Sequence, residues 1–170
     1  LSRNYPIFAG DGFGAFFTNL QRCYPGWLHG EDWEPEIREL PLNGPGEADL
    51  PGGIRLRTQP ANHSAGALHI RLEAGGRSVV FSGDTGPSED LVELAAGTDL
   101  LLCECALNAP KEGVLHLWPA AVRDLLAAAR PQRALLTHFY EEVDEASALQ
   151  IAGASQVWVR RAFDGQVMEV

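Results

Sequence analysis

The sequence predicts an α/β domain, and three observations lead to that prediction. Apolar residues make up 45% of the 170 residues, which is enough for one buried core. After residue 75, strand-like and helix-like segments follow in the order strand, helix, strand, helix, strand. No apolar run reaches the roughly 18 residues that cross a bilayer, so we expect no membrane partner.

The N-terminal third predicts less regular structure. Residues 11–24 carry apolar side chains at helical spacing, so we predict a short amphipathic helix that ends before Pro25. Residues 25–53 are rich in proline, glycine and acidic groups, and we interpret them as a loop-like segment with a short strand at 36–40. Residues 54–58 alternate between apolar and polar, which predicts a strand.

A hairpin is predicted next. Residues 66–73 alternate, with apolar side chains on one face and polar ones on the other. His69 belongs to the polar face, so we expect it to be solvated. The Gly75-Gly76 pair predicts a turn into a buried strand at 78–82.

The remaining segments complete the α/β pattern. Ser88 is placed to cap a helix over 88–96, and acidic residues fill its first turn. The further predicted elements are a buried strand at 99–104, a helix at 118–129, a buried strand at 134–138, and a hairpin of 156–160 with 166–170 around Asp164-Gly165.

Three of these strands end on residues that can bind a metal or take part in catalysis: Asp84, Glu104 and His138. His63 lies in the loop that follows the strand at 54–58. Ligand sites of α/β sheets collect at the carboxyl ends of the strands, and carboxylates and imidazoles suit zinc. Taken singly, each residue also has a structural explanation: Asp84 as a turn residue, His63 on a surface loop, His138 in a core, and Glu104 as a solvent-capping carboxylate.

Two segments resemble the later half of the metallo-β-lactamase superfamily: NHSAGALHIRLEAGGRSVVFSGDTGPSEDLVELAAGTDLLLCECAL and HLWPAAVRDLLAAARPQRALLTHFY. The similarity is greatest to the ribonuclease Z-like and general metal-hydrolase branches. It implies an αββα sandwich in which His63, Asp84 and His138 bind metal, with Asp84 bridging two ions. Zinc is the expected metal, with manganese or iron as alternatives. Asp84 and Glu104 are the implied catalytic residues, and Glu104 is expected to orient a ligand or relay protons.

The sequence departs from this family in two places. The His-x-His-x-Asp-His loop of the family is absent from the 170 residues, so we expect a partial domain over residues 1–170 whose N-terminal half is missing. Cys103 replaces a catalytic histidine of ribonuclease Z, and the net charge is −10. Both features argue against tRNA processing and nucleic-acid partners. Zinc β-lactamases of the commonest type use cysteine at the position of Asp84, so antibiotic hydrolysis is not expected.

Four other residues also receive an interpretation from the sequence. His116 is expected either to make a hydrogen bond at the start of a helix or to face the substrate. Tyr140 is expected to border the pocket. Cys103 and Cys105 are interpreted as buried small residues, with a redox-active pair as the alternative.

The resulting hypothesis is a metal-dependent hydrolase that acts on a small ester, phosphodiester or thioester through a metal-bound hydroxide. The alternative is a metal-free binding or structural module derived from the same fold, or an inactive fragment. Three cysteines and no signal peptide favour a reduced, cytoplasmic location. The phenylalanine-rich helix at 11–24 predicts either a core contact or the face of a homodimer.

Overall fold

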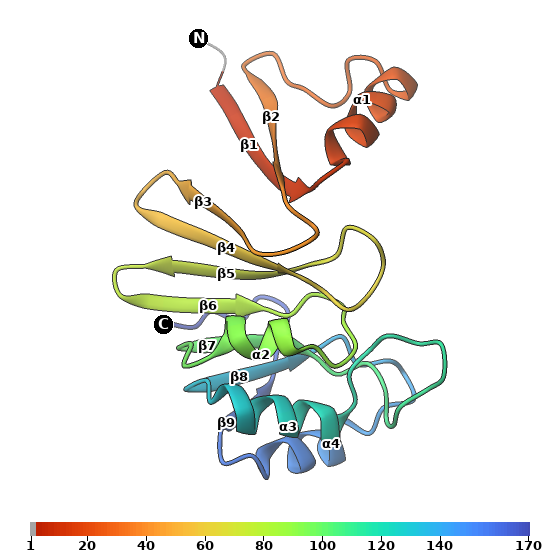
Figure 1. Cartoon of the computed structure of the whole chain (residues 1–170), viewed down its shortest axis with the longest axis vertical. Helices are drawn as coiled ribbons and strands as arrows, with labels where there is room; N and C mark the ends of the chain where they lie inside the picture. Colours follow the sequence, from red (N-terminus) through yellow and green to blue (C-terminus); the bar gives the residue numbers. More distant parts are fainter. Residues whose placement is uncertain (1–2) are drawn as a thin grey trace.

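A computed structural model describes residues 3–170 of the chain and shows a mixed α/β fold (Figure 1). In that described part the helices and strands are β1 (Arg3–Gly10), α1 (Phe13–Cys23), β2 (Trp33–Leu40), β3 (Gly46–Leu50), β4 (Ile54–Pro60), β5 (Leu68–Ala74), β6 (Arg77–Phe81), α2 (Glu89–Ala95), β7 (Leu100–Glu104), α3 (Pro119–Ala129), β8 (Arg133–Thr137), α4 (Glu145–Gly153) and β9 (Trp158–Arg161). None of the described helices is long and apolar enough to span a membrane.

The main sheet has seven strands in the order β3-β4-β5-β6-β7-β8-β9. The first four strands pair antiparallel, and β6 to β9 pair parallel. Parallel neighbours need a crossover, and α2, α3 and α4 supply the three crossovers. The predicted α/β alternation is therefore confirmed, and the carboxyl ends of β6, β7 and β8 meet at one edge of the sheet (Figure 1).

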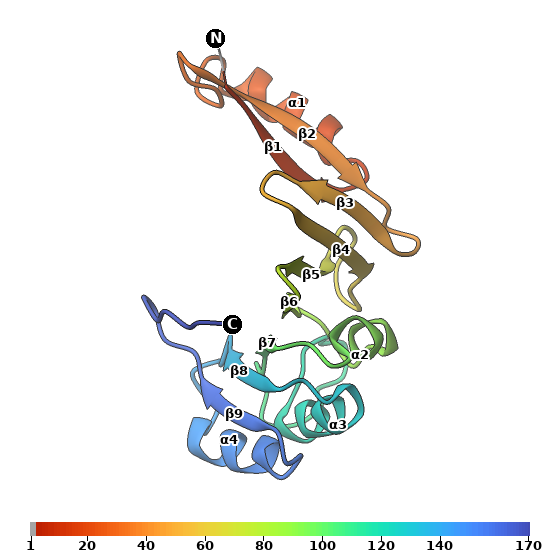
Figure 2. The ribbon, with the colours of Figure 1, turned by 90° about the vertical axis from the view of Figure 1, so that its left-hand side faces the viewer.

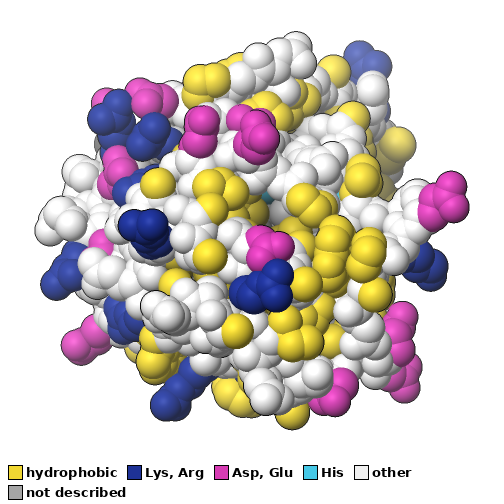
Figure 3. All heavy atoms as spheres, turned by 60° about the horizontal axis from the view of Figure 1, so that its bottom comes forward, with side chains coloured by type: hydrophobic (Ala, Val, Ile, Leu, Met, Phe, Trp, Pro, Cys, Tyr) yellow, Lys and Arg dark blue, Asp and Glu magenta, His cyan; other side chains and the backbone are white. Residues whose placement is uncertain are grey.

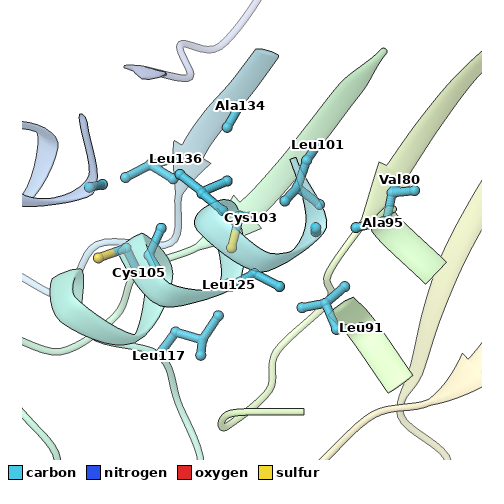
Figure 4. Packing of buried hydrophobic residues seen from close by; sticks show 14 of the residues in the cluster. Val80, Leu91, Ala95, Leu101, Cys103, Cys105, Leu117, Leu125, Ala134 and Leu136 are labelled. Carbon is cyan, nitrogen blue, oxygen red and sulfur yellow. The ribbon is translucent and has the colours of Figure 1, made fainter. Parts of the chain in front are cut away.

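The core lies between this sheet and the helices. Val80, Leu101 and Leu136 come from neighbouring strands and are fully buried, and Leu91 of α2 and Leu125 of α3 pack against them (Figure 4). Burying one such leucine stabilises a fold by about 1.5–3 kcal/mol. This core fixes the strand ends that carry the polar residues considered below.

The opposite face of the sheet is more open. Ile70 and Phe81 are direct partners across β5 and β6, and they remain 36% and 38% exposed. His69 lies on the other face and is completely buried, because α2 packs against β4 and β5 there. The prediction that His69 is solvated is therefore wrong. The helices cover the more polar face of β5.

The N-terminal segment forms a unit of its own. β1 and β2 pair in parallel as a two-stranded sheet beside α1 (Figure 2). The predicted helix is confirmed, but the loop-like interpretation of residues 25–53 is only partly right. β2 is longer than the strand predicted at 36–40, and β3 follows it. No residue of α1 is buried, although the helix carries three phenylalanines.

The C-terminal hairpin is the second wrong prediction. β9 pairs in parallel with β8 after the crossover helix α4, and residues 166–170 form no strand. Asp144 caps α4 by accepting hydrogen bonds from the amides of Ala146 and Ser147. The tail is held by another contact, in which Arg133 donates to the carbonyl of Glu169 at 2.9 Å.

The surface that carries α3 and α4 mixes charged groups with small hydrophobic patches (Figure 3). A groove of about 490 Å³ lies between α2 and α3, with Leu117, Trp118 and Leu125 in its wall and Glu89 and Asp124 also lining it. The predicted metal ligands do not line this groove. They lie on the loops at the sheet edge.

Candidate metal site

Asp84 follows β6 at the carboxyl edge of the sheet. Gly83 adopts a left-handed φ of 57°, which turns the chain sharply after the strand. The Asp84 loop is joined to the His63 loop by two hydrogen bonds. The amide of Gly86 donates to the carbonyl of Asn62 at 2.9 Å, and the amide of Asn62 donates to Oγ1 of Thr85 at 3.2 Å. These bonds hold the two loops side by side.

His63, Asp84 and His116 converge at this edge. Each offers one ligand atom, and these atoms all lie within 4.8 Å of one another. The ring centroids of His63 and His116 are 5.0 Å apart. Asp84 is exposed, His63 is half-buried and His116 is buried, so the cluster opens to solvent on the Asp84 side.

His138 joins the cluster from the end of β8. Its backbone is left-handed, with a φ of 58°, which is uncommon for a residue with a side chain. Its Nε2 lies 3.6 Å from Oδ1 of Asp84, and its ring centroid lies 5.3 Å from that of His116. The structure thus brings His63, Asp84 and His138 together, as the sequence predicted, and adds His116.

Glu104, at the end of β7, lies behind the cluster and is 1% exposed. Its carboxylate accepts four hydrogen bonds: from the amides of Thr85 (2.6 Å), Ala106 (3.2 Å) and Leu117 (3.1 Å), and from Nδ1 of His116 (2.8 Å). One buried carboxylate therefore joins the Asp84 loop, its own strand end and the start of α3. Glu104 orients His116, and not one of the three predicted ligands.

The tautomer of His116 follows from these partners. An ionised carboxylate only accepts, so Nδ1 of His116 carries the proton that is shared with Glu104. Nε2 is then a lone-pair acceptor, and the hydroxyl of Tyr140 lies 2.9 Å from it. Both nitrogens of His116 are therefore engaged in hydrogen bonds. Among the described residues, Nε2 of His63 and the ring nitrogens of His138 make no hydrogen bond, so they are available to bind a metal.

Local sequence signals gave only part of this arrangement. The predicted hydrogen bond of His116 is present, but its position against His63 and His138 depends on the tertiary contact between three loops. Cys103 and Cys105 are free and buried, as predicted. Burial raises the pKa of both thiols, that of Cys105 to about 12, which does not favour a redox-active pair.

The sequence matches one family model, described as a beta-lactamase superfamily domain, over residues 22–139. An uncharacterized protein of Mycobacterium leprae is 31% identical over 122 residues, which is 70% of this chain and 40% of that protein. Ribonuclease Z 1 of Schizosaccharomyces pombe is 25% identical over 122 residues, which is 69% of this chain and 15% of that protein. The chain therefore spans well under half of the length of these relatives.

Solved structures share the fold at low sequence identity. YhfI from Bacillus subtilis, a metallo-beta-lactamase fold protein, has a TM-score of 0.76 at 18% identity, over 96% of this chain and 64% of that one. The short form of human tRNase Z has a TM-score of 0.75 at 16% identity, over 98% and 67%. Zinc-bound PqqB from Methylobacterium extorquens has a TM-score of 0.67 at 16% identity, over 99% and 66%.

Proposed function

Because the chain belongs to the beta-lactamase superfamily domain family, we propose that it provides part of the active site of a metal-dependent hydrolase. The substrate class is a small ester, phosphodiester or thioester. The observation that carries the proposal is the convergence of His63, Asp84 and His138 beside the buried pair of Glu104 and His116.

The donor set fits zinc. Imidazole nitrogens and a carboxylate oxygen are ligands that a borderline metal accepts, and iron or manganese are alternatives. We assign His63, Asp84 and His138 as the ligands, because both nitrogens of His116 already have hydrogen-bond partners. When bound, zinc supplies Lewis-acid chemistry: it polarises a substrate oxygen and makes a bound water more acidic.

The chain's own residues prepare the site for that chemistry. Glu104 fixes the ring of His116 and its tautomer, so that Nε2 carries the lone pair and can take up a proton. Tyr140 lies at that nitrogen and is 36% exposed, so its hydroxyl connects His116 with the solvent side. In this proposal His116 holds or releases the proton that the reaction requires, and Glu104 is its positioning residue.

Three ligands suit a single four-coordinate zinc that keeps one open position. Two ions require about eight ligand positions, and this chain offers three assigned side chains. A second ion therefore needs ligands from outside the 170 residues, in agreement with the larger size of the relatives. The acidic net charge of −10 favours a small-molecule substrate over a nucleic acid.

The metal content of the purified full-length protein tests the proposal. We expect bound zinc, measured by plasma mass spectrometry, and hydrolysis of bis(p-nitrophenyl) phosphate or a thioester. Asp84→Asn should lower both by at least tenfold, while Asp124→Asn, an exposed control on α3, should lower neither. A protein that binds no metal and hydrolyses neither substrate would contradict the proposal and favour a metal-free binding module.

A further inference from the structure

Tyr140 lies beside the candidate metal site, on the loop that follows β8 and carries the assigned ligand His138. The centroid of its ring is 5.4 Å from that of His138 and 5.4 Å from that of His116. Two backbone bonds hold the loop: the amide of Tyr140 donates to the carbonyl of Ala106 at 3.4 Å, and the amide of Val143 donates to the carbonyl of Tyr140 at 2.9 Å. Tyr140 is therefore held against an assigned ligand and against a histidine that is not one.

A side chain from the neighbouring loop fixes the same segment. Asn108, which follows β7, donates from its side-chain amide to the carbonyl of Glu142 at 2.8 Å, and its Oδ1 accepts from the amide of Asp144 at 3.4 Å. Asn108 thus ties the loop after β8 to the loop that leads to His116. The contact between Tyr140 and His116 is built on these two joined loops.

The hydroxyl of Tyr140 occupies the lone pair of His116. Nδ1 of His116 donates to Glu104 at 2.8 Å, so Nε2 carries the lone pair, and the Tyr140 hydroxyl donates to it at 2.9 Å. His116 is 7% exposed, so water has little access to replace this donor. A metal ion binds a neutral imidazole through the same kind of lone pair. The tyrosine hydroxyl and a metal therefore compete for one nitrogen.

His116 is within reach of a metal at the site. One of its ring nitrogens lies within 4.8 Å of a ligand atom of His63 and of one of Asp84. Two ligand atoms of one zinc are at most about 4.2 Å apart, because each lies about 2.1 Å from the ion. A side-chain movement on the order of 1 Å therefore brings His116 into the coordination sphere, and the bond to Tyr140 opposes that movement.

The number of protein ligands decides what a zinc site can do. Zinc with four protein ligands is typical of structural sites, whereas catalytic sites keep one position open for water or substrate. His63, Asp84 and His138 supply three ligands and leave that position open. His116 as a fourth ligand would close it, and its Nε2 would no longer be available to take up a proton.

We propose that Tyr140 is a positioning residue whose hydroxyl holds Nε2 of His116 away from the metal and so keeps a coordination position open for the reaction. The inference rests on the proposed hydrolase function and adds to it the residue that maintains the ligand set. A purely structural hydroxyl, which only satisfies a buried nitrogen, predicts a different response of the metal site to its removal.

Removal of the hydroxyl in the full-length protein tests this role. In Tyr140→Phe, Nε2 of His116 loses its donor. We expect zinc to bind about tenfold more tightly, because one competing hydrogen bond is gone and a fourth ligand is available. We expect kcat for bis(p-nitrophenyl) phosphate to fall, since the open position is filled. Zinc affinity is measured by competition with a chromophoric chelator, and a structural role predicts unchanged or weaker binding.

A second substitution shows whether His116 is the added ligand. His116→Asn in the Tyr140→Phe background should return the zinc affinity to that of His116→Asn alone. In the cobalt-loaded protein the visible absorption bands report the number and kind of ligands, and Tyr140→Phe should change them only while His116 is present. Tyr24→Phe is the matched control, because Tyr24 is 54% exposed and lies after α1. It should leave the zinc affinity, the cobalt spectrum and kcat unchanged.

The outcomes separate this role from the hydrolase function. Equal or weaker zinc binding in Tyr140→Phe, when the wild-type protein binds zinc and hydrolyses the ester, would overturn the role of Tyr140 and leave the hydrolase function standing. Tighter binding that persists in the double variant would overturn it as well, because His116 would not be the added ligand. A wild-type protein without bound metal and without hydrolysis would overturn the hydrolase function and this inference with it.

Discussion

Nδ1 of His116 lies 2.8 Å from Oε1 of Glu104, and this bond is buried behind the exposed carboxylate of Asp84. The same Glu104 carboxylate also accepts three backbone amides, so its charge is stabilised without a cationic side chain. The carboxylate that orients His116 therefore also ties three loops together.

Replacing Glu104 by glutamine tests the structural part of this role. The amide keeps the shape of the side chain, but its NH₂ group faces N–H donors and leaves at least one of them without an acceptor. We expect the free energy of unfolding in urea to fall by about 2–3 kcal/mol. Glu93→Gln, at an exposed position of α2, should change it by less than about 0.5 kcal/mol. Equal effects of the two substitutions would contradict the structural role.

Substitutions of His116 and His138 separate proton handling from metal binding. His116→Asn should keep the zinc content of the wild-type protein and lower kcat by about 10²–10⁴-fold, the usual contribution of a general acid or base. His138→Asn should lower the zinc content itself. Mass spectrometry of the metal and steady-state kinetics measure the two effects. Loss of zinc in His116→Asn would identify His116 as a ligand and contradict the assignment.

The buried His69 predicts a pH dependence of stability. Its Nδ1 lies 2.6 Å from the carbonyl of Ser82, and its Nε2 lies 3.2 Å from Oγ of Ser88. Burial lowers the pKa of His69 in the folded state, although the bond to Ser82 and the charge of Asp90 oppose this. The unfolded chain, in which histidine has a pKa of about 6.5, therefore binds more protons over the range between the two pKa values.

It follows that His69 favours the folded state fully above about pH 6.5, and that stability falls as the pH drops below that value toward the folded pKa. The slope from this one group is at most about 1.4 kcal/mol per pH unit. Urea unfolding between pH 7.5 and 5 measures it. His69→Gln should flatten the slope, and the exposed control His29→Gln should not. A slope that survives in His69→Gln would assign it to other groups.

The sequence was a good guide from β6 to β8, where local pattern and tertiary structure agree. The apolar strands, the Ser88 cap and the stripe of α3 each point to the fold that forms. The tips of these strands could therefore be predicted to share one edge, and Asp84, Glu104 and His138 follow or end these strands there.

In other segments the local structure depends on contacts with residues that are distant in the sequence. β1 pairs with β2 across a separation of 30 residues, as between Arg3 and Trp33, and no local pattern specifies that pairing. The alternation of β5 predicted its two faces correctly but not which face the helices cover, so His69 was misplaced. His116 could be recognised as a hydrogen-bonding residue, but its contact with His63 required the loops to fold together.

Gly83, which precedes Asp84, provides a test of how the loop geometry supports the site. A methyl group added at Gly83 would lie 3.1 Å from the carbonyl oxygen of Leu68, in a backbone region with φ of 57°. At Gly97 the φ is 62°, but no atom lies within 4 Å of the added group. Both alanine variants meet the left-handed backbone cost of about 1–2 kcal/mol, and only Gly83→Ala also has to move a backbone neighbour.

We therefore expect Gly83→Ala to lower the free energy of unfolding more than Gly97→Ala does, and to weaken zinc binding because Asp84 is displaced. Gly97→Ala should leave the zinc affinity unchanged. Urea unfolding and zinc titration with a chromophoric chelator measure both quantities. Equal losses of stability with wild-type zinc affinity in Gly83→Ala would show that the loop adjusts around the methyl group, and that the position of Asp84 does not depend on a glycine at residue 83.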